Sequence, residues 1–127
     1  MQATNSAIQS CLIVDDHKGV RDLLRDLLTE RFEQISESTN GSDAVSFCMK
    51  QPPEIVIMDI EMPGTDGITA TRAIVRSHPE SKVVVLTHHN SPRIKRAALE
   101  AGAIAFIPKA DVGQLAELLD SLEDSPF

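Results

Sequence analysis

Cys11-Leu12-Ile13-Val14-Asp15-Asp16 is a short apolar run that gives way abruptly to two carboxylates. Such a run, in which apolar and polar residues do not alternate, is typical of a strand buried on both faces of a parallel sheet. The residues that follow are apolar at intervals of three and four, which predicts a helix with one buried face. These residues are Val20, Leu23, Leu24, Leu27 and Leu28. A strand followed at once by such a helix is the repeating unit of an α/β fold.

The same unit recurs along the rest of the chain. Further strands are predicted at Ile55–Met58, Val83–Leu86 and Ile104–Ile107, and a weaker apolar run at Ile35–Ser38 predicts one more. Each run precedes a helical pattern, so that strands and helices alternate strictly. A strict alternation of this kind favours a parallel sheet whose strands are joined by crossover helices.

Two of the later helices have recognisable ends. Ser42 is expected to cap the second helix, and Pro52–Pro53 end it. Ser91 is expected to cap the fourth helix, with Pro92 at the first helical position and Gly102 at the end. Apolar spacing predicts a third helix, with Ile68, Thr71, Ile74 and Val75 on its buried face. The fifth helix is expected to open at Asp111, with Gln114 three residues later, and to bury Val112, Leu115, Leu119 and Leu122.

Five strands that alternate with five helices predict a doubly wound, three-layer α/β fold with a five-stranded parallel sheet. For five such units the common strand order is 2-1-3-4-5, as in flavodoxin-like proteins. Ligands bind in this fold at the carboxyl ends of the strands, where the order reverses. We expect one domain at residues 10–123, with a flexible N-terminus at 1–9 and a C-terminal tail at 124–127.

The composition limits what the chain can do. Its 127 residues suffice for one domain with a core that needs no metal or disulfide. Twelve basic and 19 acidic residues give a net charge of −7, which argues against direct nucleic-acid binding. The longest apolar run, Ala103–Ile107, is too short to cross a membrane, and no export signal is recognised. Cys11 and Cys48 lie in apolar segments, so we expect buried, reduced thiols and a cytoplasmic location.

Polar residues follow the predicted strands at the edge where ligands bind. Asp15 and Asp16 follow the first strand, and Asp59 follows the third. Thr87 ends the fourth strand, and Lys109 comes shortly after the fifth. Any one of these residues could simply end a strand or cap a helix. Together they bring three carboxylates, a hydroxyl and an ammonium to one edge of the sheet, which predicts a functional site.

The clustered carboxylates point to a bound cation. Two unit charges 4 Å apart repel by about 4 kcal/mol at an effective dielectric constant of 20. Oxygen donors at an open edge suit Mg²⁺, for which Mn²⁺ can substitute. Zinc is not expected, because no Cys or His belongs to the predicted cluster. A carboxylate, a divalent cation, a lysine and a hydroxyl are the groups that phosphoryl transfer to a carboxylate requires.

Four segments resemble the receiver domains of two-component response regulators. Leu12–His17 resembles the first strand of that family, and Ile57–Gly67 resembles its phosphoacceptor strand and loop. Val85–Thr87 and Gly102–Lys109 resemble its two remaining signatures. The resemblance covers residues 10–123. It implies the receiver fold and a phosphorylated signalling switch rather than an enzyme.

The resemblance also implies roles for individual residues. Asp59 would accept a phosphoryl group from a sensor histidine kinase or phosphotransfer protein. Asp16 would be the main Mg²⁺ ligand, helped by Asp15, by Asp59 and by the backbone carbonyl of Glu61. Lys109 would pair with a phosphoryl oxygen.

A second set of implied roles concerns the switch. The Thr87 hydroxyl would move to bond the phosphoryl group, and Phe106 would follow it as the switch aromatic. This movement would change the face made by the fourth helix, the fifth strand and the fifth helix, on which an output domain or partner protein would act. A homodimer on phosphorylation is left open, since no residue argues for it.

Other residues near the site add to the family's pattern or depart from it. Gly64 permits a tight loop beside the site, and Asp66 is expected to cap the helix that follows. Pro108 precedes the lysine and Ala110 follows it, where many members have proline, so the usual cis lysine–proline bond does not carry over. This variant looks like the subfamily whose receivers precede a helix-turn-helix output domain.

His88 is expected to screen the phosphoryl group from water and to slow its loss.

Three other functions are considered. A phosphohydrolase with an aspartyl nucleophile would have a second Asp and a Gly-Thr pair where this chain has Ile60-Glu61-Met62-Pro63 after Asp59. A receiver-like module that binds partners without phosphate would not need Asp16, Thr87 and Lys109. A flavin carrier is the least favoured, because no Gly-rich phosphate loop follows the first strand and the chain has no Trp or Tyr.

Overall fold

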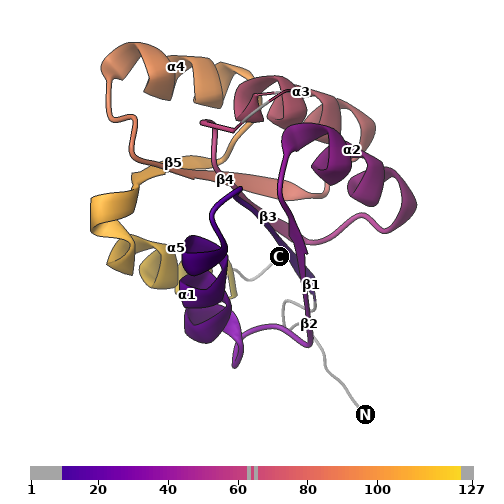
Figure 1. Ribbon diagram of the computed structural model, residues 1–127, viewed down its shortest axis with the longest axis vertical. Helices are drawn as coiled ribbons and strands as arrows, with labels where there is room; N and C mark the ends of the chain where they lie inside the picture. The colour runs from indigo at the N-terminus through magenta and orange to yellow at the C-terminus, as the bar shows by residue number, and fades with distance from the viewer. Residues whose placement is uncertain (1–9, 63, 65, 124–127) are drawn as a thin grey trace.

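The computed structural model describes residues 10–62, 64 and 66–123, and within them strands and helices alternate as predicted (Figure 1). The strands are β1 (Ser10–Val14), β2 (Gln34–Ser38), β3 (Ile55–Met58), β4 (Lys82–Thr87) and β5 (Ala105–Pro108). The helices are α1 (Lys18–Leu28), α2 (Gly41–Lys50), α3 (Gly67–Ser77), α4 (Pro92–Glu100) and α5 (Gly113–Glu123). The segments 1–9 and 124–127, expected to be a flexible N-terminus and a tail, lie outside the described residues.

The five strands pair in parallel in the order β2-β1-β3-β4-β5, which confirms the predicted topology. The order reverses at β1, which lies between β2 and β3. Among the described residues no helix is long and apolar enough to span a membrane.

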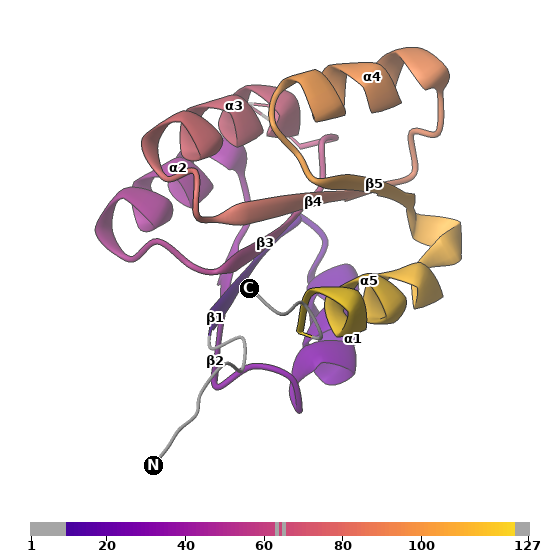
Figure 2. The same ribbon diagram turned by 180° about the vertical axis from the view of Figure 1, so that it is seen from behind.

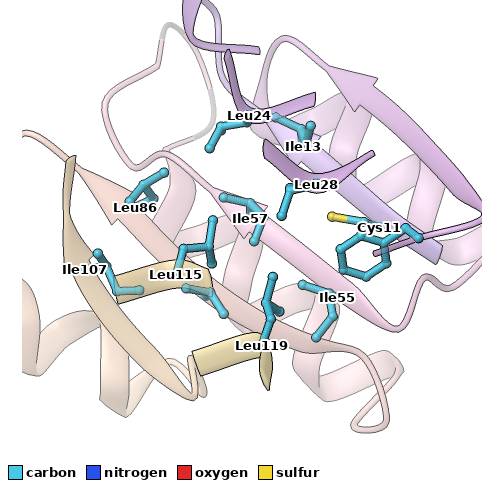
Figure 3. Packing of buried hydrophobic residues seen from close by; sticks show 12 residues of the cluster. Cys11, Ile13, Leu24, Leu28, Ile55, Ile57, Leu86, Ile107, Leu115 and Leu119 are labelled. Carbon is cyan, nitrogen blue, oxygen red and sulfur yellow. The ribbon is translucent and has the colours of Figure 1, made fainter. Parts of the chain in front are cut away.

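Helices cover both faces of the sheet. In both views α1 and α5 lie on one face, and α2, α3 and α4 lie on the other (Figures 1 and 2). On the first face Leu24 of α1 and Leu115 of α5 pack with Ile13 and Ile57 (Figure 3). On the second face Val14 and Met58 pack with helix residues such as Ile74. Successive strand residues therefore enter opposite cores, which explains why the strand sequences do not alternate with polar residues.

Both cysteines are buried, unpaired thiols, as expected. Burial raises the pKa of each thiol, that of Cys48 to about 11. Neither side chain is therefore a reactive thiolate near neutral pH. Cys11 packs in the core between the sheet and α1, and Cys48 packs in the core under α2.

Several predicted element boundaries were wrong, including the following three. Asn40, not Ser42, caps α2, because the Asn40 side chain accepts a hydrogen bond from the Asp43 N–H at 2.8 Å. The strand predicted to begin at Ile104 begins one residue later, and the Ile104 side chain is exposed. Asp111 does not open α5, because Lys109–Asp111 forms a separate 3₁₀ turn before the helix begins at Gly113.

The predicted apolar stripe of α1 is only partly buried. Leu24 and Leu28 are buried in the core, whereas Leu23 is 53% exposed and Leu27 is 48% exposed. The core-facing row of α1 consists of residues four apart, Leu24 and Leu28 with the partly buried Val20, and Leu23 and Leu27 lie beside this row. The start of α4 is as predicted. Ser91 accepts a hydrogen bond from the Ile94 N–H, and Pro92 takes the first helical position.

Candidate functional site

The predicted site residues meet at the carboxyl ends of β1, β3 and β4. Asp15 and Asp59 follow directly after β1 and β3, and both are buried. The two strands are adjacent, and the Asp59 N–H donates to the Val14 carbonyl at 2.9 Å, which extends their ladder into the site. Thr87 is the last residue of β4, the next strand along, and is also buried.

Lys109 joins the two buried carboxylates. Its Nζ lies 2.8 Å from Asp15 Oδ2 and 3.5 Å from Asp59 Oδ2. The ammonium comes from η1 (Lys109–Asp111), the 3₁₀ turn just after β5, and the Lys109 side chain is nearly buried. Residues separated by 94 positions in the sequence are thus in direct contact. Among the described residues every peptide bond is trans, including the one between Lys109 and Ala110.

Asp59 lies in surroundings that disfavour its negative charge. The residue is 3% exposed, and this burial raises the pKa of the Asp59 carboxyl. The Glu61 N–H donates to Asp59 Oδ1 at 3.2 Å, and both this bond and Lys109 oppose the rise, while the charge of Asp15 adds to it. The result is a buried carboxylate with one oxygen facing an ammonium.

Asp15, Asp16, His17 and Asp59 could together hold a metal ion, because one ligand atom from each lies within 4.8 Å of the others. Asp16 Oδ1 is a buried atom with no hydrogen-bond partner among the described residues, although His17 Nδ1 lies 3.1 Å away. A bound cation would satisfy that oxygen. Three carboxylates suit Mg²⁺ or Mn²⁺, so the donor set fits the predicted metal.

His17 is the residue of this cluster that the sequence reasoning missed. The prediction against zinc assumed that no histidine belonged to the cluster. In the structure its backbone N–H donates to Asp15 Oδ1 at 2.9 Å, and its ring lies against both Asp15 and Asp16. Its position directly after Asp16 was the available signal. The donor set still consists mainly of oxygen atoms, which keeps Mg²⁺ the better match.

Glu61, two residues after Asp59, is in contact with His89. His89 Nε2 is 2.5 Å from Glu61 Oε2, and both side chains are about half exposed. The His89 backbone N–H also donates to Thr87 Oγ1 at 3.2 Å. His88, which was expected to screen the site, is exposed. The structure therefore offers His89 rather than His88 as the histidine in contact with the loop that follows Asp59.

Two glycines and a cap shape the loop after β3. Gly64 has a φ of +82°, which side chains rarely adopt, as its predicted place in a tight loop requires. At Gly67 a Cβ would stand 2.2 Å from the Asp59 carbonyl oxygen, so α3 begins in direct contact with the Asp59 backbone. Asp66 caps α3 by accepting from the Thr69 N–H at 2.9 Å, as predicted.

Phe106 lies in β5 and is partly buried. It packs against the small core under α4, whose members include Val85 and Ala98. The expected switch aromatic therefore packs with residues of β4, which ends in Thr87, and of α4, whose face is expected to change on phosphorylation.

Comparison with known proteins identifies this combination of fold and acidic pocket. A family model described as the response regulator receiver domain matches residues 11–121. The chain therefore belongs to the receiver-domain family of response regulators and has the phosphoacceptor signalling role of that family. Receiver domains bind Mg²⁺ at an acidic pocket, and Asp15, Asp16, His17 and Asp59 form such a pocket here.

Individual relatives agree with this assignment. Response regulator UvrY from Escherichia coli K12 is 35% identical over 107 residues, which cover 81% of this chain and 48% of UvrY. Chemotaxis protein CheY from Halobacterium salinarum is 35% identical over 113 residues, 89% of this chain and 92% of that protein. A LuxR-family DNA-binding response regulator from Staphylococcus aureus superimposes with a TM-score of 0.82 at 27% identity, covering 91% of this chain and 99% of that one.

The chain spans about half the length of several curated relatives that it matches, including UvrY and the transcriptional regulatory protein DegU from Brevibacillus brevis. The receiver assignment favours neither the phosphohydrolase nor the phosphate-independent module.

Proposed function

We propose that a histidine kinase or phosphotransfer protein phosphorylates this chain on Asp59 with the help of Mg²⁺, and that the phosphoryl group alters the face made by α4, β5 and α5. The observation that carries this proposal is the position of the Asp59 carboxylate. It is buried 3.5 Å from the Lys109 ammonium and belongs to the group of acidic ligand atoms within 4.8 Å of one another.

In the transfer step an oxygen of Asp59 attacks phosphorus while the bond from phosphorus to the histidine nitrogen breaks and the nitrogen keeps the electron pair. Lys109 stands where it can pair with a phosphoryl oxygen, since its Nζ faces Asp59 Oδ2. Asp15, Asp16, Asp59 and the Glu61 carbonyl would hold Mg²⁺ or Mn²⁺, which offsets the charge of the phosphoryl oxygens.

The proposed output surface is exposed. Leu99 of α4 is a large exposed apolar residue, and Lys95 and Arg96 line a shallow groove beside it. Thr87 would draw toward the phosphoryl group and Phe106 would follow, which repacks the core under α4. Relatives described as transcriptional regulators suggest an output domain that controls transcription. The buried, unpaired thiols support a cytoplasmic location.

The test is phosphorylation with a small phosphodonor. With Mg²⁺ and acetyl phosphate, intact-mass spectrometry should show one added phosphoryl group, lost slowly by self-dephosphorylation. Asp59→Asn should show none. Asp66→Asn is the matched control, because Asp66 is an exposed carboxylate that caps α3, and this variant should be phosphorylated like the wild type. Equal labelling of Asp59→Asn and wild type would refute the assignment of Asp59.

A further inference from the structure

Arg21 on α1 joins the acidic pocket to the edge strand β2. Its Nη1 donates to the backbone carbonyl of Asp15 at 3.0 Å, and its Nε donates to Glu37 Oε1 at 2.8 Å. The Arg21 side chain is 13% exposed, so this bridge is largely shielded from water. The Asp15 backbone is also held on its N–H side, which donates to the Ser38 carbonyl at 3.1 Å.

Arg25, one helical turn later, makes a parallel set of bonds that does not reach the pocket. Its Nε donates to Glu37 Oε2 at 2.7 Å and its Nη2 donates to the Ile35 carbonyl at 3.1 Å. The Arg25 side chain is 43% exposed. Both arginines lower the pKa of Glu37, Arg25 more than Arg21. Two similar arginines therefore share one carboxylate, and among the described residues Arg21, not Arg25, also bonds to a residue of the pocket.

We infer that Arg21 is a positioning residue of the metal pocket, because it fixes the carbonyl of Asp15 and with it the direction in which the turn Asp15–His17 presents its carboxylates. The inference rests on the magnesium site proposed above. The planar guanidinium can serve Glu37 and the Asp15 carbonyl at once, which an ammonium cannot do in the same geometry. Groups that orient metal ligands commonly account for about 10- to 100-fold in metal affinity.

The test compares Arg21→Lys with Arg25→Lys. Both substitutions keep the positive charge and replace a guanidinium that donates to Glu37, so the long-range attraction of the pocket for a cation is unchanged. Titration calorimetry with Mg²⁺ on the full chain should give a dissociation constant about tenfold larger for Arg21→Lys and a wild-type value for Arg25→Lys. Thermal unfolding in EDTA measures the purely structural cost of each substitution.

The outcomes separate the inference from its foundation. A wild-type Mg²⁺ affinity in Arg21→Lys, or an equal loss in both variants, would overturn the positioning role. An absence of Mg²⁺ binding by the wild type would overturn the proposed site itself. If Arg21→Lys does not fold, Glu37→Gln serves instead, because it weakens the anchor of Arg21 and should lower Mg²⁺ affinity severalfold, and an unchanged affinity there would also overturn the inference.

Discussion

Asp59 carries its negative charge at a cost to the fold. Burial raises the pKa of its carboxyl above the ordinary value. A group whose pKa is higher in the folded state stabilises the fold when protonated, and that contribution is lost as the pH rises through the folded-state pKa. At neutral pH the negative charge that the proposed reaction needs therefore lowers the stability of the metal-free protein.

Asp59→Asn should accordingly stabilise the metal-free protein by about 1 kcal/mol at pH 7.5, or roughly 4 °C in Tm for a domain of this size. The gain should shrink as the pH falls through the raised folded-state pKa and should be gone below about 4, where the wild-type carboxyl is protonated in the folded and the unfolded chain alike. Thermal unfolding in EDTA at several pH values measures this. A variant that is less stable than wild type at pH 7.5 would show that the contact with Lys109 outweighs the burial of the charge.

The contact between His89 and Glu61 gives a second prediction for a single residue. Because His89 reaches the loop that follows Asp59, His89→Ala should open the site to water and speed dephosphorylation severalfold. His88→Ala, which was expected from the sequence to have this effect, provides the comparison at an exposed neighbouring position. Intact-mass spectrometry at intervals after removal of the phosphodonor gives the rate at which each variant loses its phosphoryl group. A faster rate in His88→Ala alone would return the screening role to His88.

At the scale of the element, the start of α3 is fixed by its contact with the backbone that follows β3. A methyl group at Gly67 would meet the carbonyl oxygen and backbone carbon of Asp59 and the Cα of Ile60, none of which can rotate away. Gly113 at the start of α5 has nothing within 4 Å of the same position. Two glycines at helix starts therefore differ in the space around them.

Gly67→Ala should destabilise the fold by about 2 kcal/mol or more, because it overpacks a backbone contact, and should lower phosphorylation. Gly113→Ala should leave stability unchanged or raise it by up to about 1 kcal/mol, because alanine is the better helix former. Urea unfolding of the two variants gives the comparison. Equal stability of both variants would mean that α3 can shift away from Asp59 without cost.

The strands and helices also show which structural features the local sequence predicts and which it does not. The four residues Ile55–Met58 were predicted as a strand because a run buried on both faces must be apolar throughout, and all of them are buried. The cap of α2 was misplaced because Asn40 and Ser42 are both good caps, and the backbone conformation decides between them. Leu23 and Leu27 were expected to be buried because periodicity gives the direction of a helix face and not the width that its neighbours cover.

For the whole molecule, the acidic pocket predicts that metal binding and stability are linked. A ligand that binds only the native state stabilises it by mass action, by about 2.7 kcal/mol at a concentration 100 times its dissociation constant. Mg²⁺ should therefore raise the Tm of the wild type, and Ca²⁺ at equal concentration should raise it less, because a small set of donors suits the smaller ion. An unchanged Tm at saturating Mg²⁺ would contradict the metal site.

The order of strand ends along the chain was enough to place Asp15, Asp59, Thr87 and Lys109 at one edge of the sheet, because parallel strands all end on the same side. The apolar runs were likewise enough for the layers, since burial on two faces leaves no room for polar residues. These conclusions needed only the regular geometry of strands and helices.

Side-chain pairing was decided by the tertiary structure alone. Arg21 meets Glu37 across 16 positions, and the sequence offers many other partners of opposite charge for each of them. His89 meets Glu61, and His17 turns back onto the two preceding carboxylates, because loop conformation sets where those rings point. A pattern of residues specifies which backbone segments are buried, whereas a contact between two long polar side chains depends on distances that only the folded chain fixes.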